Sequence, residues 1–339
     1  MKEVKEYSVI ITGGGSVMGQ SIYKALANST YAKYMNVICL NSLEINAGFN
    51  FETTLSKFKS QTNIICPFAS NREEYVAFIE GLIEKHAVDI IYPGTQHELD
   101  ILSILNDNVG IVACPDNKTA RNCLDKANTT EILEANDIPT PKSIRVINGF
   151  VENDEIPVSY PVILKPNSSS ASRNVFKCDN SSSLHSSLNE YKSLGIEEAV
   201  IQTYLDGPEY TCGVYLDKYS QSISTIIFER ILSEDGASLY GVVIDDKDIE
   251  DYLHLVAKAF IKESDFKFGH INVQLRNTSN GPMLFEINGR LSSTEAPKSN
   301  LGFNSVEAYF YNIVLQSPYD KFQPSFGKKF IRYYEEIYF

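Results

Sequence analysis

Met283-Leu284-Phe285-Glu286-Ile287-Asn288-Gly289-Arg290 is the stretch that decides the fold prediction, because a mostly apolar run leads directly into a carboxylate, an amide and a guanidinium. Successive side chains of a β-strand point to opposite faces, so Glu286 and Asn288 are expected on one face, and Arg290 joins them if the extended backbone continues. Residues 270–275 form a second predicted strand. The polar residues 277–282 between the two strands end in Gly-Pro, which is typical of a turn, so an antiparallel hairpin is predicted.

One face of this hairpin is predicted to hold a divalent cation. If Gln274 lies opposite Glu286, the face carries two amide oxygens and one carboxylate, with Asn288 supplying the second amide. Such oxygen ligands suit Mg²⁺, which usually takes one or two carboxylates together with substrate phosphates. Arg290 would then neutralise charge on a transferring phosphoryl group. The alternative is a hairpin whose polar face meets water, and a nucleotide site elsewhere in the chain would decide against it.

Size and composition indicate a globular protein of more than one domain. The 339 residues fit about two to three domains, and a net charge of −13 argues against nucleic acid as a partner. No apolar run approaches the roughly 20 residues that span a bilayer, and no basic-then-apolar leader opens the chain, so no membrane association is expected. The six cysteines are scattered without metal-binding spacing. This pattern predicts free thiols in the reducing cytoplasm and no zinc site.

The N-terminal residues predict a strand, a glycine turn and a helix. A buried strand at residues 8–12 is followed by three glycines at 13–15 and a helical stretch at 20–28, a geometry that presents backbone N–H groups to an anion. The lysine of a P-loop is missing after Gly19, and the glycine spacing is one residue too long for the dinucleotide fingerprint. A tight turn between strand and helix is therefore the preferred interpretation of these glycines.

Strands and helices then alternate, at residues 63–66, 72–85, 88–92, 99–105 and 110–114. This alternation predicts a parallel, doubly wound sheet, and Pro115 breaks the pattern, so a domain boundary is placed there. His97 and Glu98 follow the carboxyl end of a strand, where ligands of open α/β sheets bind. Solvated loop residues are the preferred interpretation of this pair.

The remaining chain predicts an α+β unit with basic residues next to a polar loop. A helical region at residues 117–136 is interrupted near Asp125-Lys126, and an apolar strand at 160–166 carries Lys165 at its far end. The polar loop at 167–174, which includes Arg173, follows directly. A lysine beside a loop of small residues is one way to build a phosphate site, although a lysine at a strand end often reaches solvent instead.

The order and spacing of these residues resemble the ATP-grasp superfamily, and in particular single-unit proteins similar to the large subunit of carbamoyl-phosphate synthase. The resemblance covers nearly the whole chain. It implies a Rossmann-like pre-ATP-grasp α/β domain at residues 1–115, followed by a two-lobed α+β ATP-grasp domain at 116–339 with its small lobe at about 140–205.

The resemblance also implies the role of each candidate site residue, which is ATP binding, Mg²⁺ binding or catalysis. The phosphates of ATP would be bound by Lys126, Lys165 and Arg173, its adenine by the strand from Gln202 to Tyr204, and its ribose hydroxyls by Glu209. The metal ion would be bound by Gln274, Glu286 and Asn288. The catalytic residues would be Arg290 and Lys165. Two positions depart from the family pattern. Serines occupy the loop at 168–174 where the family has glycines, and Gln202 stands where the family often has glutamate.

The function predicted from these residues is an ATP-dependent carboxylate–amine ligase that forms ADP through an acyl phosphate. Its partners would be a small carboxylate and an amine, its cofactor Mg²⁺ (with Mn²⁺ as a substitute), and its compartment the cytoplasm. Two alternative functions remain. The serine-rich loop is compatible with an ATP-binding protein that has weakened catalysis, and the N-terminal glycines are compatible with a nicotinamide oxidoreductase. The sequence indicates no oligomeric state, so a homodimer is the default expectation because it is the commonest assembly.

Overall fold

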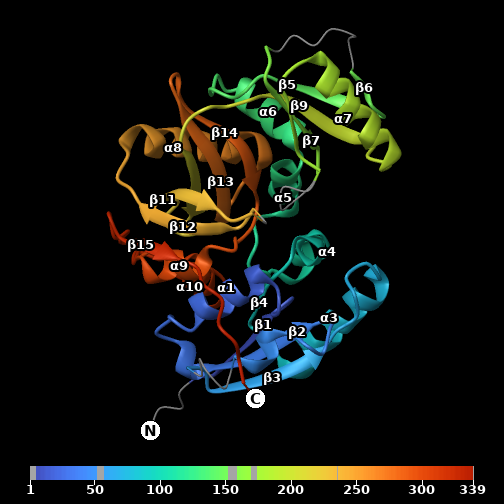
Figure 1. Ribbon diagram of the computed structural model, residues 1–339. Helices are drawn as coiled ribbons and strands as arrows, with labels where there is room; N and C mark the ends of the chain where they lie inside the picture. The colour runs from blue at the N-terminus through green and yellow to red at the C-terminus, as the bar shows by residue number, and fades with distance from the viewer. Residues whose placement is uncertain (1–4, 52–56, 152–158, 169–173, 235, 339) are drawn as a thin grey trace.

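Three β-sheets form the framework of the protein (Figure 1). The computed structural model describes residues 5–51, 57–151, 159–168, 174–234 and 236–338. A four-stranded sheet occupies the N-terminal unit, a five-stranded sheet the small lobe, and a six-stranded sheet the large lobe. The predicted class, an α/β unit followed by an α+β unit, is confirmed.

The N-terminal unit is a parallel sheet with helices packed against it. Its strands are β1 (Tyr7–Ile11), β2 (Met35–Asn41), β3 (Ser60–Ile65) and β4 (Ile90–Tyr92), in the order β3-β2-β1-β4. Its helices are α1 (Val17–Leu26), α3 (Arg72–His86) and α4 (Gln96–Val109), with short 3₁₀ turns η1 (Ala32–Tyr34) and η2 (Ala47–Asn50). The predicted strand at 110–114 reduces to one bridge between Ile91 and Val112, because its neighbour β4 has only three residues.

The glycine turn after β1 is tight, as the sequence predicted. Gly13 has a φ of +51°, and a Cβ on Gly19 would lie 2.2 Å from the carbonyl oxygen of Gly13. Helix α1 starts three residues earlier than predicted, because the side chain of Ser16 caps it by accepting from the backbone N–H of Gly19. The glycines thus allow α1 to pack closely against the end of β1.

The small lobe is an antiparallel sheet in the order β6-β5-β9-β7-β8. Its strands are β5 (Ser143–Ile147), β6 (Phe150–Val151), β7 (Val162–Pro166), β8 (Phe176–Cys178) and β9 (Glu198–Thr203), and α7 (Ser181–Ser193) packs against it. Helices α5 (Asn117–Leu124) and α6 (Lys126–Glu134) precede this lobe in the chain. They are the two halves of the predicted helical region, interrupted at Asp125 as expected, and Asp125 caps α6 by accepting from the N–H of Asn128.

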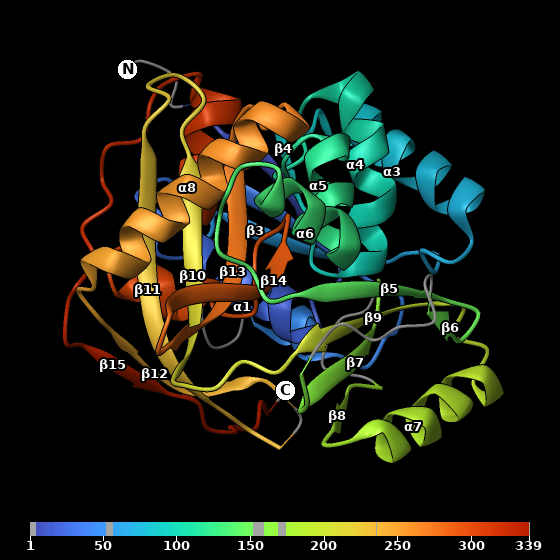
Figure 2. The same cartoon turned by 90° about the horizontal axis from the view of Figure 1, so that it is seen from above.

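The large lobe is an antiparallel sheet in the order β14-β13-β10-β11-β12-β15. Its strands are β10 (Glu209–Leu216), β11 (Ile223–Leu232), β12 (Ser238–Val243), β13 (Gly269–Thr278), β14 (Gly281–Asn288) and β15 (Lys329–Ile331). Helix α8 (Lys247–Ser264) lies across β10 and β11 (Figure 2) and buries one apolar face, including Val256 and Phe260, against the sheet. The predicted hairpin is β13–β14, and its strands continue through the predicted turn, since Thr278 pairs with Gly281.

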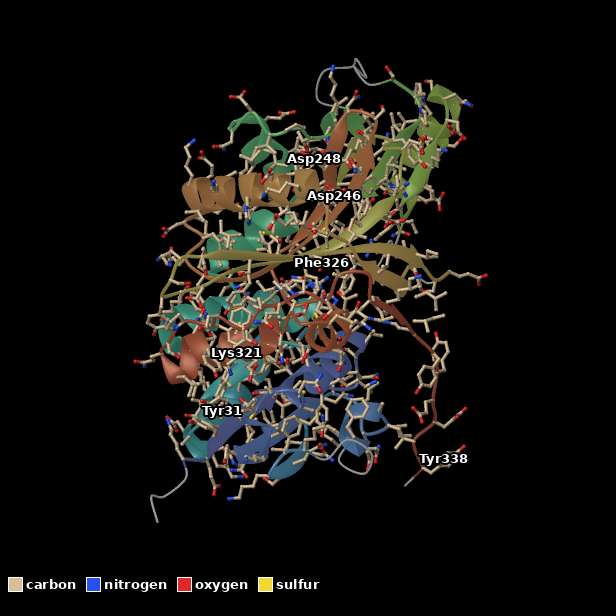
Figure 3. The ribbon with its side chains drawn as sticks, turned by 90° about the vertical axis from the view of Figure 1, so that its left-hand side faces the viewer. Tyr31, Asp246, Asp248, Lys321, Phe326 and Tyr338 are labelled. Atoms are coloured by element: carbon tan, nitrogen blue, oxygen red, sulfur yellow. The ribbon has the colours of Figure 1, made fainter. Side chains whose placement is uncertain are left out.

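C-terminal segments pack the large lobe onto the N-terminal unit. They comprise α9 (Glu295–Asn300), α10 (Ser305–Phe310) and the π-helical turn η3 (Tyr311–Leu315). Phe310 shares an apolar cluster with Tyr7 of β1, and the hydroxyl of Tyr92 donates to the carbonyl of Val306 at 2.8 Å. The chain beyond β15 runs back beside the N-terminal unit, where Tyr338 lies (Figure 3). Because segments distant in sequence share this core, the domain division at residue 115 stays a prediction.

No helix in the described ranges is long and apolar enough to cross a membrane.

Candidate active site

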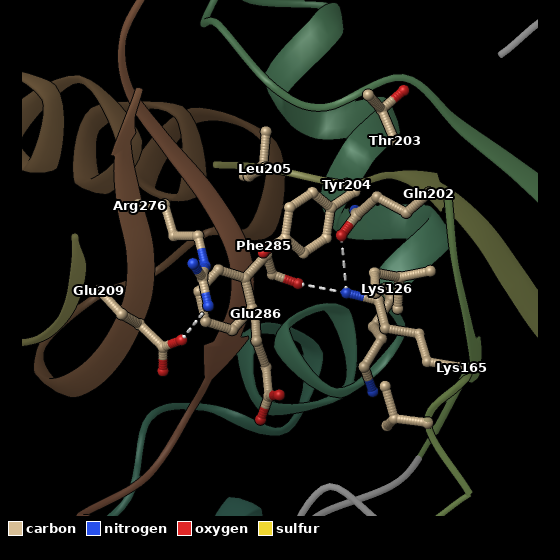
Figure 4. Close-up of a pocket in the computed structure, with 12 residues that line it drawn as sticks. Lys126, Lys165, Gln202, Thr203, Tyr204, Leu205, Glu209, Arg276, Phe285 and Glu286 are labelled. Carbon is tan, nitrogen blue, oxygen red and sulfur yellow. Dashed lines mark hydrogen bonds and ion pairs between the residues drawn. The ribbon is translucent and has the colours of Figure 1, made fainter. Parts of the chain in front are cut away.

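A cavity of about 180 Å³ lies between the two lobes, and six of the predicted site residues line it (Figure 4). These residues are Lys126, Lys165, Gln202, Tyr204, Glu209 and Glu286. They come from α6, β7, β9 and the following hinge, β10 and β14. Residues separated by up to 160 positions in sequence therefore converge on one space.

Lys165 crosses from the small lobe to the large lobe. Its Nζ donates to Gln202 Oε1 at 2.8 Å and to the backbone carbonyl of Phe285 at 2.6 Å, and the residue is only 5% exposed. The alternative of a lysine that reaches solvent is thus wrong for this position. Burial, and to a smaller extent the nearby charge of Lys126, lower the pKa of Lys165 to about 7, against the opposing effect of Glu286.

Lys126 stands beside Lys165 as the first residue of α6. Its Nζ donates to the backbone carbonyl of Asn167 at 3.2 Å, just before the predicted phosphate loop. Burial also lowers the pKa of Lys126, while the carboxylates of Glu286 and Asp125 raise it. Two buried ammonium groups side by side repel each other, so the site favours an anion that would neutralise both.

The hinge after β9 forms the apolar end of the cavity, together with Ile163, Val175 and Phe285. Gln202 is buried, and its Nε2 donates to Ser143 Oγ at 3.0 Å while its Oε1 accepts from Lys165. The oxygen predicted to meet adenine therefore already accepts one hydrogen bond, and its second lone pair is left for a ligand. The ring of Tyr204 lies 4.4 Å from Lys177 Nζ and 5.8 Å from the Arg276 guanidinium, which fixes its orientation.

Two arginines that the sequence did not suggest hold Glu209. Arg230 Nη2 donates to Glu209 Oε1 at 2.7 Å, and Arg276 Nη2 donates to Glu209 Oε2 at 2.8 Å. Arg230 Nη2 also donates to Gln274 Oε1 at 2.8 Å. One guanidinium thus connects the predicted ribose carboxylate with a predicted metal ligand. The only sequence signal was charge on a strand, which does not reveal the pairing.

The predicted metal ligands share one face, because Gln274 pairs with Glu286 and Asn272 with Asn288 in the β13–β14 register. Asn288 Nδ2 donates to Glu286 Oε1 at 2.9 Å. Glu286 Oε2 accepts no hydrogen bond from any described residue, so this carboxylate has an oxygen ready for a ligand. The described residues hold no cluster of three or more His, Cys, Asp and Glu suited to a metal. One carboxylate and two amide oxygens fit Mg²⁺ completed by substrate phosphates.

Arg290 reaches the same face although the extended backbone stops at Asn288. The backbone N–H of Arg290 donates to the carbonyl of Asn288 at 2.8 Å, which turns the chain. The side chain still returns, and Nη2 donates to Asn288 Oδ1 at 3.1 Å. Its other contact of note is with the N-terminal unit, since Nε donates to Gln96 Oε1 at 2.7 Å.

A buried polar network lies behind the metal face and holds the segment that follows Arg290. Lys298 Nζ donates to Glu295 Oε1 at 3.0 Å and to Asn272 Oδ1 at 3.1 Å. His270 lies beside this pair, and burial lowers its pKa to about 3, so it is neutral. The network fixes α9 against β13, and it was not visible in the sequence because it depends on tertiary packing.

Two further predictions have different outcomes. Arg173 and residues 169–173 of the predicted phosphate loop lie outside the described residues. Glu98 is not a solvated loop residue: it is 5% exposed and accepts from the hydroxyls of Thr12 at 2.9 Å and Thr95 at 2.8 Å. Burial raises the pKa of Glu98, and the residue fastens the glycine turn to α4. His97 is exposed, as expected.

Residues 158–296 match the family model of the ATP-grasp domain. The chain thus contains an ATP-grasp domain over these residues, so the resemblance found in the sequence is confirmed. The match begins in the small lobe and ends in α9, and it includes the cavity residues from Ile163 to Glu286.

Three individual proteins are similar to this chain in sequence or in structure. The α-aminoadipate–LysW ligase LysX of Saccharolobus solfataricus is 34% identical over 166 residues, which are 43% of this chain and 56% of that ligase. The L-amino acid ligase of Bacillus licheniformis has a TM-score of 0.69 at 16% identity, over 96% of this chain and 78% of its own. The third is the biotin carboxylase domain of the Hydrogenobacter thermophilus 2-oxoglutarate carboxylase, a dimer solved with MgADP, ADP and bicarbonate. Its TM-score is 0.70 at 17% identity, and the match covers 96% of this chain and 73% of that chain. At such identities the structures show the fold alone.

Proposed function

We propose that this protein is an ATP-dependent carboxylate–amine ligase that forms ADP through an acyl phosphate. The observation that carries the proposal is the cavity between the lobes, where Lys126 and Lys165 lie on one side and Glu286 on the other. Arg290 stands at the end of the same strand face. Paired cations opposite an oxygen ligand for a metal ion form a site for a metal-bound triphosphate.

Different residues of the cavity would bind different parts of the nucleotide. Adenine occupies the apolar end beside Phe285, with Gln202 accepting from its amino group, and Glu209 accepts from the ribose hydroxyls. Lys126 and Lys165 donate to the phosphates. Bound Mg²⁺ would be held by Glu286, Asn288 and Gln274 and would neutralise charge on the phosphates during transfer. Burial of the two lysines strengthens their attraction to phosphate, because little water competes.

The proposed reaction has two steps. A substrate carboxylate oxygen attacks the γ-phosphorus, the bond to the bridging oxygen breaks, and ADP leaves with the electron pair. The amine nitrogen then attacks the acyl carbon, and phosphate leaves with the carboxylate oxygen as the amine loses a proton. Arg290 neutralises the transferring phosphoryl group, as positioning and charge neutralisation are what proteins contribute to such transfers.

Amino acids are the substrates to test first. The names of the LysX ligase and the L-amino acid ligase both concern amino acids. The experiment is a screen of amino acids in pairs for ATP-dependent release of ADP and phosphate. Hydroxylamine in place of the amine should trap a hydroxamate when the correct carboxylate is present. Formation of AMP and pyrophosphate would contradict the acyl-phosphate route.

A variant of Glu286 links this activity to the site. Glu286→Gln keeps the side-chain shape but removes the ligand charge, so turnover should fall by ~100-fold or more while the protein stays folded. Glu229→Gln is the matched control, because Glu229 is an exposed carboxylate on β11 of the same sheet. Normal turnover of Glu286→Gln would show that Glu286 is a solvated strand residue.

Two alternatives remain distinguishable by ligand binding. A weakened ATP-binding protein would show a thermal shift with MgATP but no ADP release with any carboxylate. A nicotinamide oxidoreductase would show a shift with NADH and none with MgATP. The tight glycine turn weighs against the second, because the backbone N–H of Gly14 already donates to the carbonyl of Leu40 at 2.9 Å.

A further inference from the structure

Arg290 is held at three of its nitrogen atoms. Nε donates to Gln96 Oε1 at 2.7 Å, Nη1 to the carbonyl of Leu291 at 3.1 Å and to the sulfur of Met18 at 3.5 Å, and Nη2 to Asn288 Oδ1 at 3.1 Å. A guanidinium has five N–H groups in a fixed plane. Four are used here, so one N–H of Nη2 has no acceptor among the described residues. These contacts fix the plane and leave one donor on the side of the predicted metal face.

Gln96 can hold Arg290 in only one amide orientation. Arg290 Nε is purely a donor, so it requires the oxygen of Gln96. The nitrogen of the same amide, Nε2, donates to Asp100 Oδ1 at 2.8 Å. Asp100 lies four residues further along α4, one helical turn away, and its carboxylate only accepts. Asp100 therefore selects the amide orientation that presents oxygen to Arg290.

The backbone under Gln96 is also firmly placed. Gln96 is the first residue of α4, and the N-cap Thr95 accepts from the backbone N–H of Glu98 at 3.2 Å. Glu98 in turn binds Thr12 at the end of β1. Helix α4 packs against α5, which contacts β14. The position of Gln96 is thus tied to both the N-terminal sheet and the strand that carries Glu286.

The contact lies next to open space. Gln96 and Asp100 line a second cavity of about 700 Å³, together with Pro166 and Ser168. Pro166 follows Lys165 directly in β7, so consecutive residues of one strand line the two cavities. Gln96 thus connects this cavity with the guanidinium of Arg290, through the hydrogen bond from Arg290 Nε.

We propose that Gln96, oriented by Asp100, is a positioning residue that aims Arg290 at the phosphoryl group, so that the N-terminal unit completes the transfer site. The inference rests on the proposed function for the role of Arg290. A tether that merely joins α4 to the large lobe would make the same contacts. The two roles differ in kinetics, because a misaimed guanidinium slows transfer without loosening the nucleotide.

The test compares two variants with the wild type. Gln96→Met removes the amide but keeps a side chain of similar length, and Asp100→Ala allows the Gln96 amide to rotate by about 180°, which exchanges its oxygen and nitrogen. Asp107→Ala is the control, since Asp107 is an exposed acid on the same helix. Gln96→Met should lower kcat by ~10-fold or more and leave KM for ATP within about twofold, and Asp100→Ala should act in the same direction. A parallel loss of ATP affinity and stability with normal kcat would overturn the proposal.

A second readout does not depend on substrates. The ¹⁵N resonance of Arg290 Nε–H, assigned by its loss in Arg290→Lys, should be protected from exchange with water in the wild type. It should shift and exchange faster in Gln96→Met and Asp100→Ala, and stay unchanged in Asp107→Ala. An unchanged signal in Gln96→Met would overturn the proposal. If the signal responds but no carboxylate supports ADP formation, the positioning contact holds and the proposed ligase function fails.

Discussion

Replacing Lys165 with methionine should stabilise the nucleotide-free protein while abolishing its response to MgATP. Burial lowers the pKa of Lys165 from 10.5 to about 7. In the unfolded chain this lysine has its ordinary pKa, so the folded state is disfavoured while the lysine is protonated. Between pH 7 and 10.5 the unfolded state binds more protons, and the wild type therefore gains stability as pH rises through this window. Below pH 7 both states are protonated, and the dependence ends.

The magnitude follows from the two pKa values. At ~1.4 kcal/mol for each pH unit, the protonation cost at pH 7 is about 4 kcal/mol relative to the neutral lysine. The variant loses the donor to Gln202 and Phe285, which costs about 1 kcal/mol for each hydrogen bond. The net gain at pH 7 is therefore about 2 kcal/mol. Because the wild type gains about 2 kcal/mol between pH 7 and pH 9, the difference should nearly vanish at pH 9.

Urea unfolding at pH 7, 8 and 9 measures this difference for the wild type and Lys165→Met. Lys258→Met on the exposed face of α8 is the control, and its difference from the wild type should not change with pH. The reasoning is refuted if the difference for Lys165→Met is equally independent of pH. A normal thermal shift of Lys165→Met with MgATP would separately refute the phosphate contact.

Three further predictions concern the nucleotide site and the glycine turn. Arg230→Met should weaken MgATP binding by ~10-fold or more, because Gln274 Oε1 loses its donor and Glu209 keeps only Arg276; titration calorimetry would show an unchanged affinity if Arg230 has no such role. At pH 8 the wild type should take up to ~1 proton on binding MgATP, since phosphate restores the charge of Lys165; heats that are identical in buffers of different ionisation enthalpy would contradict this. Gly13→Ala should destabilise the protein by about 2 kcal/mol or more, because its φ is +51° and the new Cβ would lie 2.7 Å from an oxygen of Glu98; an unchanged urea midpoint is the result that counts against it.

The β13–β14 hairpin could be predicted because its information is local. Two apolar strands with an intervening turn fix a register, and alternation then puts Glu286 opposite Gln274. The interruption near Asp125-Lys126 could be predicted because it too is local, and the structure shows Asp125 as the N-cap of α6. The strand predicted at residues 110–114 failed because its pairing depended on a neighbour, β4, of only three residues.

The partners of the site residues could not be predicted, because they depend on how distant elements pack. Arg230 reaches Gln274 across 44 positions, and Gln96 reaches Arg290 across 194. The sequence of a single strand or helix does not reveal which carboxylate an arginine will pair with, or which way a glutamine amide will be oriented. Glu98 was misjudged for a related reason: a carboxylate after a strand is usually solvated, and only the packing of α4 under the glycine turn buries it.

Transfer of ¹⁸O from the carboxylate substrate to the released phosphate is the most direct test of the proposed reaction. The proposed attack on the γ-phosphorus leaves one carboxylate oxygen in the phosphate when the amine displaces it. Mass spectrometry should therefore find one ¹⁸O atom per phosphate, with ADP as the unlabelled nucleotide product. Label in AMP, or unlabelled phosphate alongside amide product, would contradict the acyl-phosphate ligase.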